Sequence, residues 1–159
     1  VTVTGEFDAD ELAGVIDLFG ALTPSELESA LDELAFKRGE SVDAEAVADA
    51  VDDAVASYAV GRYRDDDRTL LVAGPAAFPT LPDGAEDLPH ILDVPDRDVD
   101  REALSEAVLA RLSTDAIAAI NESDADRLAV LADVTYDIEA WAPVDATPIR
   151  DRIVAELDE

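Results

Sequence analysis

The only histidine of the chain, His90, lies between two carboxylates that could orient its imidazole for general-base catalysis. Asp87 precedes it by three residues and Asp93 follows it by three. A nucleophile would have to come from a serine or threonine elsewhere, because the sequence has no cysteine and no GxSxG elbow. One histidine also cannot build a multi-histidine metal site. An enzyme with His90 as general base is therefore one hypothesis, and a hydrogen-bonded structural histidine is the alternative.

Three arginines, Arg62, Arg64 and Arg68, fall within seven residues of a predicted hairpin. Arg62 and Arg64 alternate along one strand, so they share a face that could contact the phosphates of DNA or an acidic partner. The alternative is that the arginines neutralise the three neighbouring acids at positions 65–67.

The segment DRDVDRE, residues 96–102, begins like a calcium-binding loop, with aspartates at its first, third and fifth positions. Such a loop needs a glycine at its sixth position and a glutamate at its twelfth, where this chain has Arg101 and Ala107. We therefore interpret the aspartates as the start of a helix, where negative charge is favourable. The chain also lacks a glycine-rich phosphate loop, so we expect no metal and no cofactor.

Trp141, the only tryptophan, shortly precedes Pro143 at the predicted end of a helix. A buried indole can anchor a protein interface, so Trp141 is a candidate interaction residue. Packing in the core or at its edge is the alternative.

The chain is strongly acidic, with 39 acidic residues, 11 basic residues and a net charge of −28. In dilute salt such repulsion opposes compaction, whereas in molar salt the screening length falls to about 3 Å. The acids occur in every segment of the chain and do not form a tail. We therefore expect a halophilic protein, in which acidic patches are adaptations to salt before they are binding sites.

No apolar run reaches the roughly 18 residues that a membrane span needs. The first residues, VTVTGEFDADEL, also lack the basic and apolar segments of a secretion signal. We therefore expect a cytoplasmic protein without a membrane partner.

Capping residues and apolar periodicity predict three helices in the first half of the chain. They begin after Asp8, Thr23 and Asp43. A hairpin follows over YAVGRYR and RTLLVAG, with a three-residue loop at 65–67. The side chains that the third helix should turn inward are Val47, Val51, Ala54, Val55 and Tyr58.

Residues 75–97, here called the strap, hold five of the eight prolines and are too interrupted for a helix. They are also too apolar for a free linker, since full burial of a large apolar side chain contributes about 1.5–3 kcal/mol. We therefore expect the strap to be ordered and to lie on the core. Its buried side chains should be Phe78, Leu81, Leu88, Ile91 and Leu92.

The second half predicts further helices. One begins near Asp100 and could restart at Ser113, the next follows a capping box at 123–126, and the last begins at Thr147. The inward side chains of the last helix should be Ile149, Ile153, Val154 and Leu157.

These elements predict a mostly helical α+β fold. It would combine a first unit over residues 1–74, the strap over 75–97 and a helical unit over 98–159 that shares one core with the first. The first unit, with three helices and a β-hairpin, resembles the winged helix-turn-helix family, and LTPSELESALDELAFKRG stands where its second helix would be. Nearly the whole chain also resembles an uncharacterised haloarchaeal family, a domain of unknown function, through that segment and GPAAFPTLPDGAEDLPHILDV. This second resemblance implies a halophilic origin and no particular activity.

Winged helices usually place the third helix in the major groove of DNA. Here the outer face of that helix would repel a polyanion. It carries Glu45, Asp49, Asp52 and Asp53. We therefore expect a non-enzymatic interaction or regulatory protein that binds a protein partner through the winged unit or the strap. An enzyme using His90 and a DNA-binding regulator using the hairpin arginines remain the alternatives.

Overall fold

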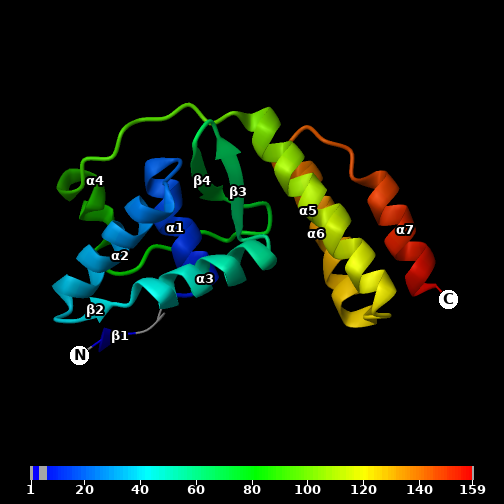
Figure 1. Ribbon diagram of the computed structural model, residues 1–159, viewed down its shortest axis with the longest axis horizontal. Coiled ribbons are helices and arrows are strands. Elements are labelled where there is room, and N and C mark those ends of the chain that lie inside the picture. The colour runs from blue at the N-terminus through cyan, green and yellow to red at the C-terminus, as the bar shows by residue number, and fades with distance from the viewer. Residues whose placement is uncertain (1, 4–6, 159) are drawn as a thin grey trace. The chain divides into compact units, whose positions relative to one another are not determined.

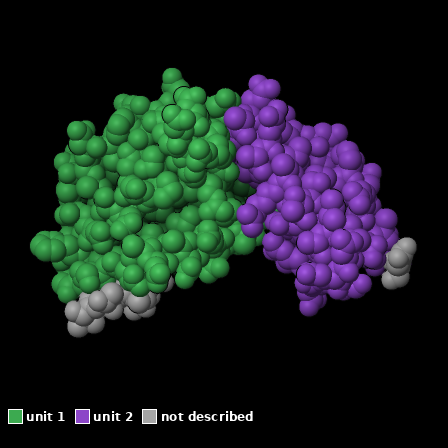
Figure 2. All heavy atoms as spheres, in the orientation of Figure 1, with its two compact units in different colours: residues 1–100 green, residues 101–159 purple. Residues whose placement is uncertain are grey.

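The computed structural model describes residues 2–3 and 7–158, with side chains from Phe7 onward. The chain forms two compact units, Val1–Asp100 and Arg101–Glu159 (Figure 2). The prediction of a mostly helical α+β fold is confirmed. The strap belongs to the first unit, and the idea of one core shared by both units stays a prediction.

Three capped helices open the first unit (Figure 1). They are α1 (Ala9–Phe19), α2 (Pro24–Lys37) and α3 (Ala44–Ala56). As predicted, Asp8, Thr23 and Asp43 accept hydrogen bonds from backbone N–H groups of the first turns. The first two caps are full capping boxes, because the glutamate at the third helical position accepts a hydrogen bond from the backbone N–H of the capping residue.

An antiparallel hairpin follows α3 and consists of β3 (Val60–Asp65) and β4 (Arg68–Ala73). The predicted three-residue loop is wrong, because Asp65 pairs with Arg68 and only residues 66–67 form the turn. Asp66 takes a left-handed conformation with φ of 54°, which aspartate tolerates better than most residues. The other edge of β4 exchanges two backbone hydrogen bonds with Leu22, in the turn between α1 and α2.

A second, parallel pair of strands was not predicted, and it consists of β1 (Thr2–Val3) and β2 (Ser41–Val42). Each has two residues, which is too short to show an alternating pattern.

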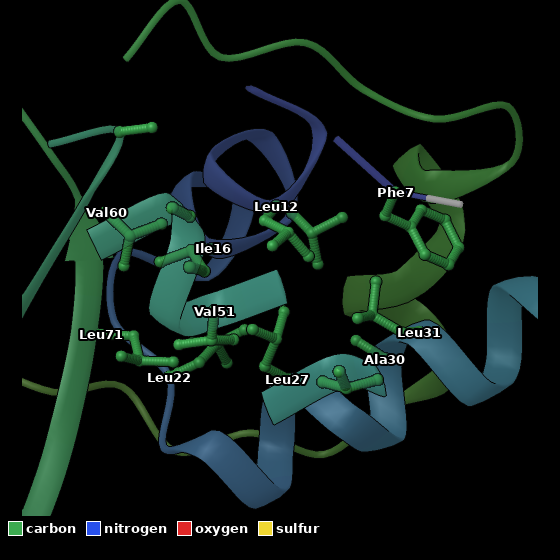
Figure 3. Packing of buried hydrophobic residues seen from close by; sticks show 14 of the residues in the cluster. Phe7, Leu12, Ile16, Leu22, Leu27, Ala30, Leu31, Val51, Val60 and Leu71 are labelled. Atoms are coloured by element: carbon green, nitrogen blue, oxygen red, sulfur yellow. The ribbon is translucent and has the colours of Figure 1, made fainter. Parts of the chain in front are cut away.

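The core of the first unit lies where α1, α2, α3 and the hairpin meet. Figure 3 shows Leu12, Leu27 and Val51, one from each helix, turned toward the same interior. All five side chains that the third helix was expected to turn inward are buried, but Tyr58 lies beyond the end of α3 at Ala56. The chain after the hairpin adds Ala85 and Leu88 to this core.

The order of the strap stays a prediction, and the expectation that it contains no helix is wrong. It contains the 3-10 helix η1 (Ala85–Asp87) and the short α4 (Leu88–Ile91). Pro89 is compatible with α4 because it stands in the first turn, where a backbone N–H is not needed. Leu88 is fully buried and Leu92 is half-buried. The expected burial of Phe78, Leu81 and Ile91 is wrong, because these side chains remain 78%, 48% and 45% exposed.

The strap passes over α1 at very close range. Asp10 holds it twice, since its carboxylate accepts from the Phe78 N–H and its carbonyl from the Thr80 N–H. The Thr80 carbonyl oxygen then occupies the space beside Gly14, where an added Cβ would lie only 1.9 Å away. A glycine in the middle of α1 therefore permits the contact, although glycine disfavours a helix.

The second unit consists of α5 (Arg101–Asn121), α6 (Ala125–Trp141) and α7 (Thr147–Leu157). The possible restart at Ser113 is absent, since α5 is continuous. The cap of α6 is Asp124 and not Ser123, whose φ of 53° places it in the preceding turn. In α7 Ile153 is buried, but Val154 and Leu157 are exposed, contrary to expectation.

Among the described residues, none of the helices combines the length and the apolar character required to cross a membrane.

Candidate functional site

A groove on the first unit is lined by α2, α3 and β3 and encloses about 240 Å³. Its walls come from the first half of α2, from one face of α3 and from Arg62 on β3. The lining residues are Pro24, Glu28, Ala44, Val47, Ala48, Val51, Asp52 and Arg62.

The contribution of α3 follows from helical geometry. Its lining residues recur at intervals of three and four, which places them on one stripe of the helix. Val47 and Val51 are almost completely buried and form an apolar floor. Ala44 and Ala48 lie beside them, are exposed and have the smallest side chains that a helix commonly carries. The small side chains of Ala44 and Ala48 therefore leave a depression along this stripe of α3.

One end of the groove is marked by an ion pair between α3 and β3. Arg62 Nη1 lies 2.9 Å from Asp52 Oδ1, and the two side chains are 35% and 65% exposed. Glu28, on the α2 side, forms no ion pair with any residue that the structure describes. The groove thus has an apolar floor and a rim with one more carboxylate than cation.

The outer face of α3 extends this negative rim. Glu45, Asp49 and Asp53 are exposed, and none of their carboxylates pairs with a cation in the described part of the chain. Such a surface attracts cations and repels polyanions over the screening length of the solution.

The α2 wall is held in place by Glu26 at the start of that helix. Its carboxylate receives Arg97 Nη1 at 2.5 Å and Nη2 at 2.7 Å. Hydrogen bonds from Arg97 lower the pKa of Glu26, and burial opposes this effect only in part. Hydrogen bonding by Glu26 in turn raises the pKa of Arg97. The end of the strap is therefore tied to the helix that forms one side of the groove.

The structure brings only one of the three hairpin arginines to the groove. Arg62 lines it, whereas Arg68 pairs with Asp65 at 3.1 Å near the turn. Arg64 is exposed and forms no ion pair within residues 7–158. Two of the three arginines thus have a carboxylate partner on or beside the hairpin.

His90 lies on α4, away from the groove lining, and is exposed. It forms no hydrogen bond or ion pair with any described residue, so neither Asp87 nor Asp93 orients it. Asp87 instead lies 4.0 Å from Lys37. Among the described residues, the structure therefore shows neither the carboxylate–imidazole arrangement nor the hydrogen bond expected of a structural histidine.

Trp141 is the last residue of α6, is half-buried and belongs to the second unit. The described residues also contain no group of three histidine, cysteine or acidic side chains that could hold a metal ion.

A comparison with protein families matches residues 10–158 to DUF7109, a family of unknown function. The chain belongs to this family. The match extends through both units of this DUF7109 member and includes every residue of the groove. No curated protein and no solved structure matches the chain.

The sequence did not reveal the groove of this DUF7109 member. Val47, Val51, Asp52 and Arg62 were named for other reasons, and Pro24, Glu28, Ala44 and Ala48 were not candidates. One signal was available, because the stripe Ala44–Val47–Ala48–Val51 continues the buried face of α3 onto exposed alanines. That signal indicates that the apolar face of α3 is wider than its buried part. The face forms a groove only because residues of α2 and β3 line its two sides.

Proposed function

We propose that this DUF7109 member is a non-enzymatic interaction protein whose first unit binds a protein partner in the groove between α2, α3 and β3. The observation that carries the proposal is the hollow apolar stripe of α3, which is open to solvent between two walls. Apolar side chains of a partner would be removed from water there, which is the main driving force for association.

The chemistry of the lining favours binding over catalysis. It contains aliphatic side chains, two carboxylates and one guanidinium, and it contains no hydroxyl, thiol or imidazole. The groove therefore offers packing and charge, without a nucleophile beside a base.

The electrostatics favour a protein over DNA as partner. If the first unit functions as a winged helix, α3 is the element that would approach the major groove. Its exposed carboxylates would face the phosphates, and Arg62, the one cation in the groove lining, is outnumbered there by Glu28 and Asp52. The element order of three helices and a hairpin supports the winged-helix resemblance, here with its recognition face used for protein contact. We further propose that this protein works in a salt-rich cytoplasm, since its net charge is −28.

Site-specific photo-crosslinking tests the function. A photoreactive residue in place of Ala48, which lies in the groove, should crosslink one protein in cells of the source organism. The same residue in place of Ala129, an exposed alanine of α6, serves as the matched control and should not capture that protein. Adding Ala44→Trp to the Ala48 probe should fill the groove and abolish the crosslink. A crosslink that survives Ala44→Trp, or the absence of any crosslinked protein, contradicts the proposed function.

A further inference from the structure

The shape of the groove specifies the form of its occupant, if the proposed function holds. The α3 stripe extends from Ala44 to Asp52, which is about two helical turns and about 12 Å. A groove of this length between two helices and a strand matches the binding mode in which an amphipathic helix inserts apolar side chains. Those side chains would contact Val47 and Val51, and the alanines leave room for the helix to approach closely.

The charges around the groove specify the flanks of that occupant. Asp52 and Glu28 lie on the rim, and Glu45 and Asp49 continue the negative surface along α3. A partner with arginine or lysine beside its apolar residues would lower this repulsion on binding. An acidic segment would increase the repulsion, and a second copy of this chain would bring another 28 negative charges.

The Asp52 carboxylate, now paired with Arg62, could bind one cation of the partner. Both side chains are partly exposed, so the pair contributes little to the stability of the fold and can open without a large penalty. An incoming guanidinium could then take the place of Arg62 on the Asp52 carboxylate and bind it through two nitrogens.

We propose that the groove binds a basic amphipathic helix, with aliphatic side chains on the Val47–Val51 floor and an arginine or lysine on Asp52. The inference rests on the proposed function and adds the chemistry of the partner. Acidic segments and nucleic acid are the competing occupants, and the test below includes both.

Peptide binding tests the inference. Three fluorescent peptides of about four helical turns are compared by anisotropy in the same potassium chloride concentration. The first places leucines on one face and arginines on its borders, the second has the same composition in scrambled order, and the third carries glutamate in place of arginine. The first should bind about tenfold more tightly than either of the others. A short DNA duplex, measured in parallel, should not bind.

Variants connect that affinity to the groove. Ala48→Trp should weaken binding of the first peptide about tenfold, whereas Ala129→Trp, on an exposed face of α6, should leave it unchanged. Asp52→Asn should weaken it measurably with the circular dichroism spectrum unchanged. Equal affinity for the ordered and scrambled peptides, or equal effects of the two tryptophan variants, overturns the inference.

The two proposals can be wrong separately. If the Ala48 photoprobe captures a partner but the basic peptide does not bind in the groove, the inference is wrong and the proposed function stands. If the peptide binds but no cellular protein is captured, the proposed function is wrong.

Discussion

Glu26 and Arg97 form a two-pronged ion pair across 71 residues of sequence, and it joins the start of α2 to the end of the strap. The Arg97 side chain is only 9% exposed. Glu26 also accepts the Thr23 N–H at 2.8 Å, so the same carboxylate completes the cap of α2. The Glu26 side chain thus both caps the start of α2 and holds the end of the strap against it through Arg97.

Replacing Arg97 with lysine should destabilise the first unit. Lysine keeps the charge but cannot present two parallel N–H groups to the Glu26 carboxylate. The free energy of unfolding should fall by about 1.5–3 kcal/mol, the range for hydrogen bonds to charged groups. Urea titration followed by circular dichroism measures this change. Arg68→Lys is the control, since the more exposed Arg68–Asp65 pair should change stability by less than about 1 kcal/mol. Equal effects of the two substitutions would show that the buried pair has no special role.

The same pair should produce a defined dependence of stability on pH. Because the folded-state pKa of Glu26 is lowered, chiefly by its hydrogen bonds with Arg97, its contribution is present above the ordinary value of 4.5. The contribution is lost as pH falls through the lowered pKa. Glu26→Gln retains an acceptor for the capping box but has no charge to titrate. The stability difference between wild type and Glu26→Gln should therefore be largest near neutral pH and shrink in acid.

Asp137 provides the control of opposite sign. Partial removal from water and the neighbouring Asp133 raise the pKa of Asp137, although the residue remains exposed. Its charged form therefore opposes folding at neutral pH, and this effect disappears in acid. Asp137→Asn should therefore be more stable than wild type near neutral pH, and the gain should vanish as pH falls. Parallel pH profiles for Glu26→Gln and Asp137→Asn would contradict both assignments.

The contact between Gly14 and the strap predicts a local effect of one methyl group. In Gly14→Ala the new Cβ would meet the Thr80 carbonyl oxygen at 1.9 Å, so the strap must move away from α1. The hydrogen bonds from the Phe78 and Thr80 N–H groups to Asp10 should then weaken. Hydrogen exchange at these two amides should accelerate, and overpacking should cost about 1–3 kcal/mol.

Gly39→Ala is the matched control for that substitution. A Cβ at Gly39 would meet no atom within 4 Å, although its φ of 72° makes alanine locally unfavourable. Its effect should remain at the end of α2, with the exchange of Phe78 and Thr80 amides unchanged. Faster exchange in both variants would show that the strap responds to general destabilisation.

Local signals allowed the helices to be predicted well. Asp8, Thr23 and Asp43 cap their helices as expected, because a cap depends on residues only two or three positions apart. At α6, Ser123 and Asp124 are adjacent residues that can both cap. The choice falls on Asp124 because Ser123 is needed in the turn that ends α5, where Asp124 N–H donates to the Ala119 carbonyl.

Long-range packing explains what the sequence could not predict. Leu88 and Ile91 are both apolar strap residues, yet only Leu88 faces the core. The composition of the strap does not say which of its faces meets α1 and α2. The groove has the same origin, because Ala48 becomes part of a hollow only when α2 and β3 stand on either side of it.

The buried hydroxyl of Thr135 joins α6 to α7 in the second unit. Thr135 donates to the Ala132 carbonyl and accepts from Arg150 Nε at 2.9 Å. Arg150 also binds Glu139 and stacks on Tyr136 with its guanidinium 3.9 Å from the ring centre, which ties α7 to α6. Thr135→Val leaves the Arg150 N–H without its acceptor and should cost about 1–3 kcal/mol. Thr114→Val removes only an exposed bond within α5 and should change the free energy of unfolding by less than about 0.5 kcal/mol. Similar losses in the two variants would contradict the role of Thr135 in joining α6 and α7.

The acidic surface predicts that folding depends on salt. Lowering potassium chloride from about 1 M to about 0.1 M increases the electrostatic screening length from about 3 Å to about 10 Å, so repulsion among carboxylates increases. The free energy of unfolding should therefore fall steadily over that range. A variant with Glu45→Gln, Asp49→Asn and Asp53→Asn removes three exposed, unpaired charges from α3 and should lose less stability in low salt. Urea titrations of both proteins across the salt series measure the two slopes. A wild-type stability that does not change with salt would contradict the halophilic proposal, and equal slopes would show that the α3 carboxylates are not a source of the repulsion.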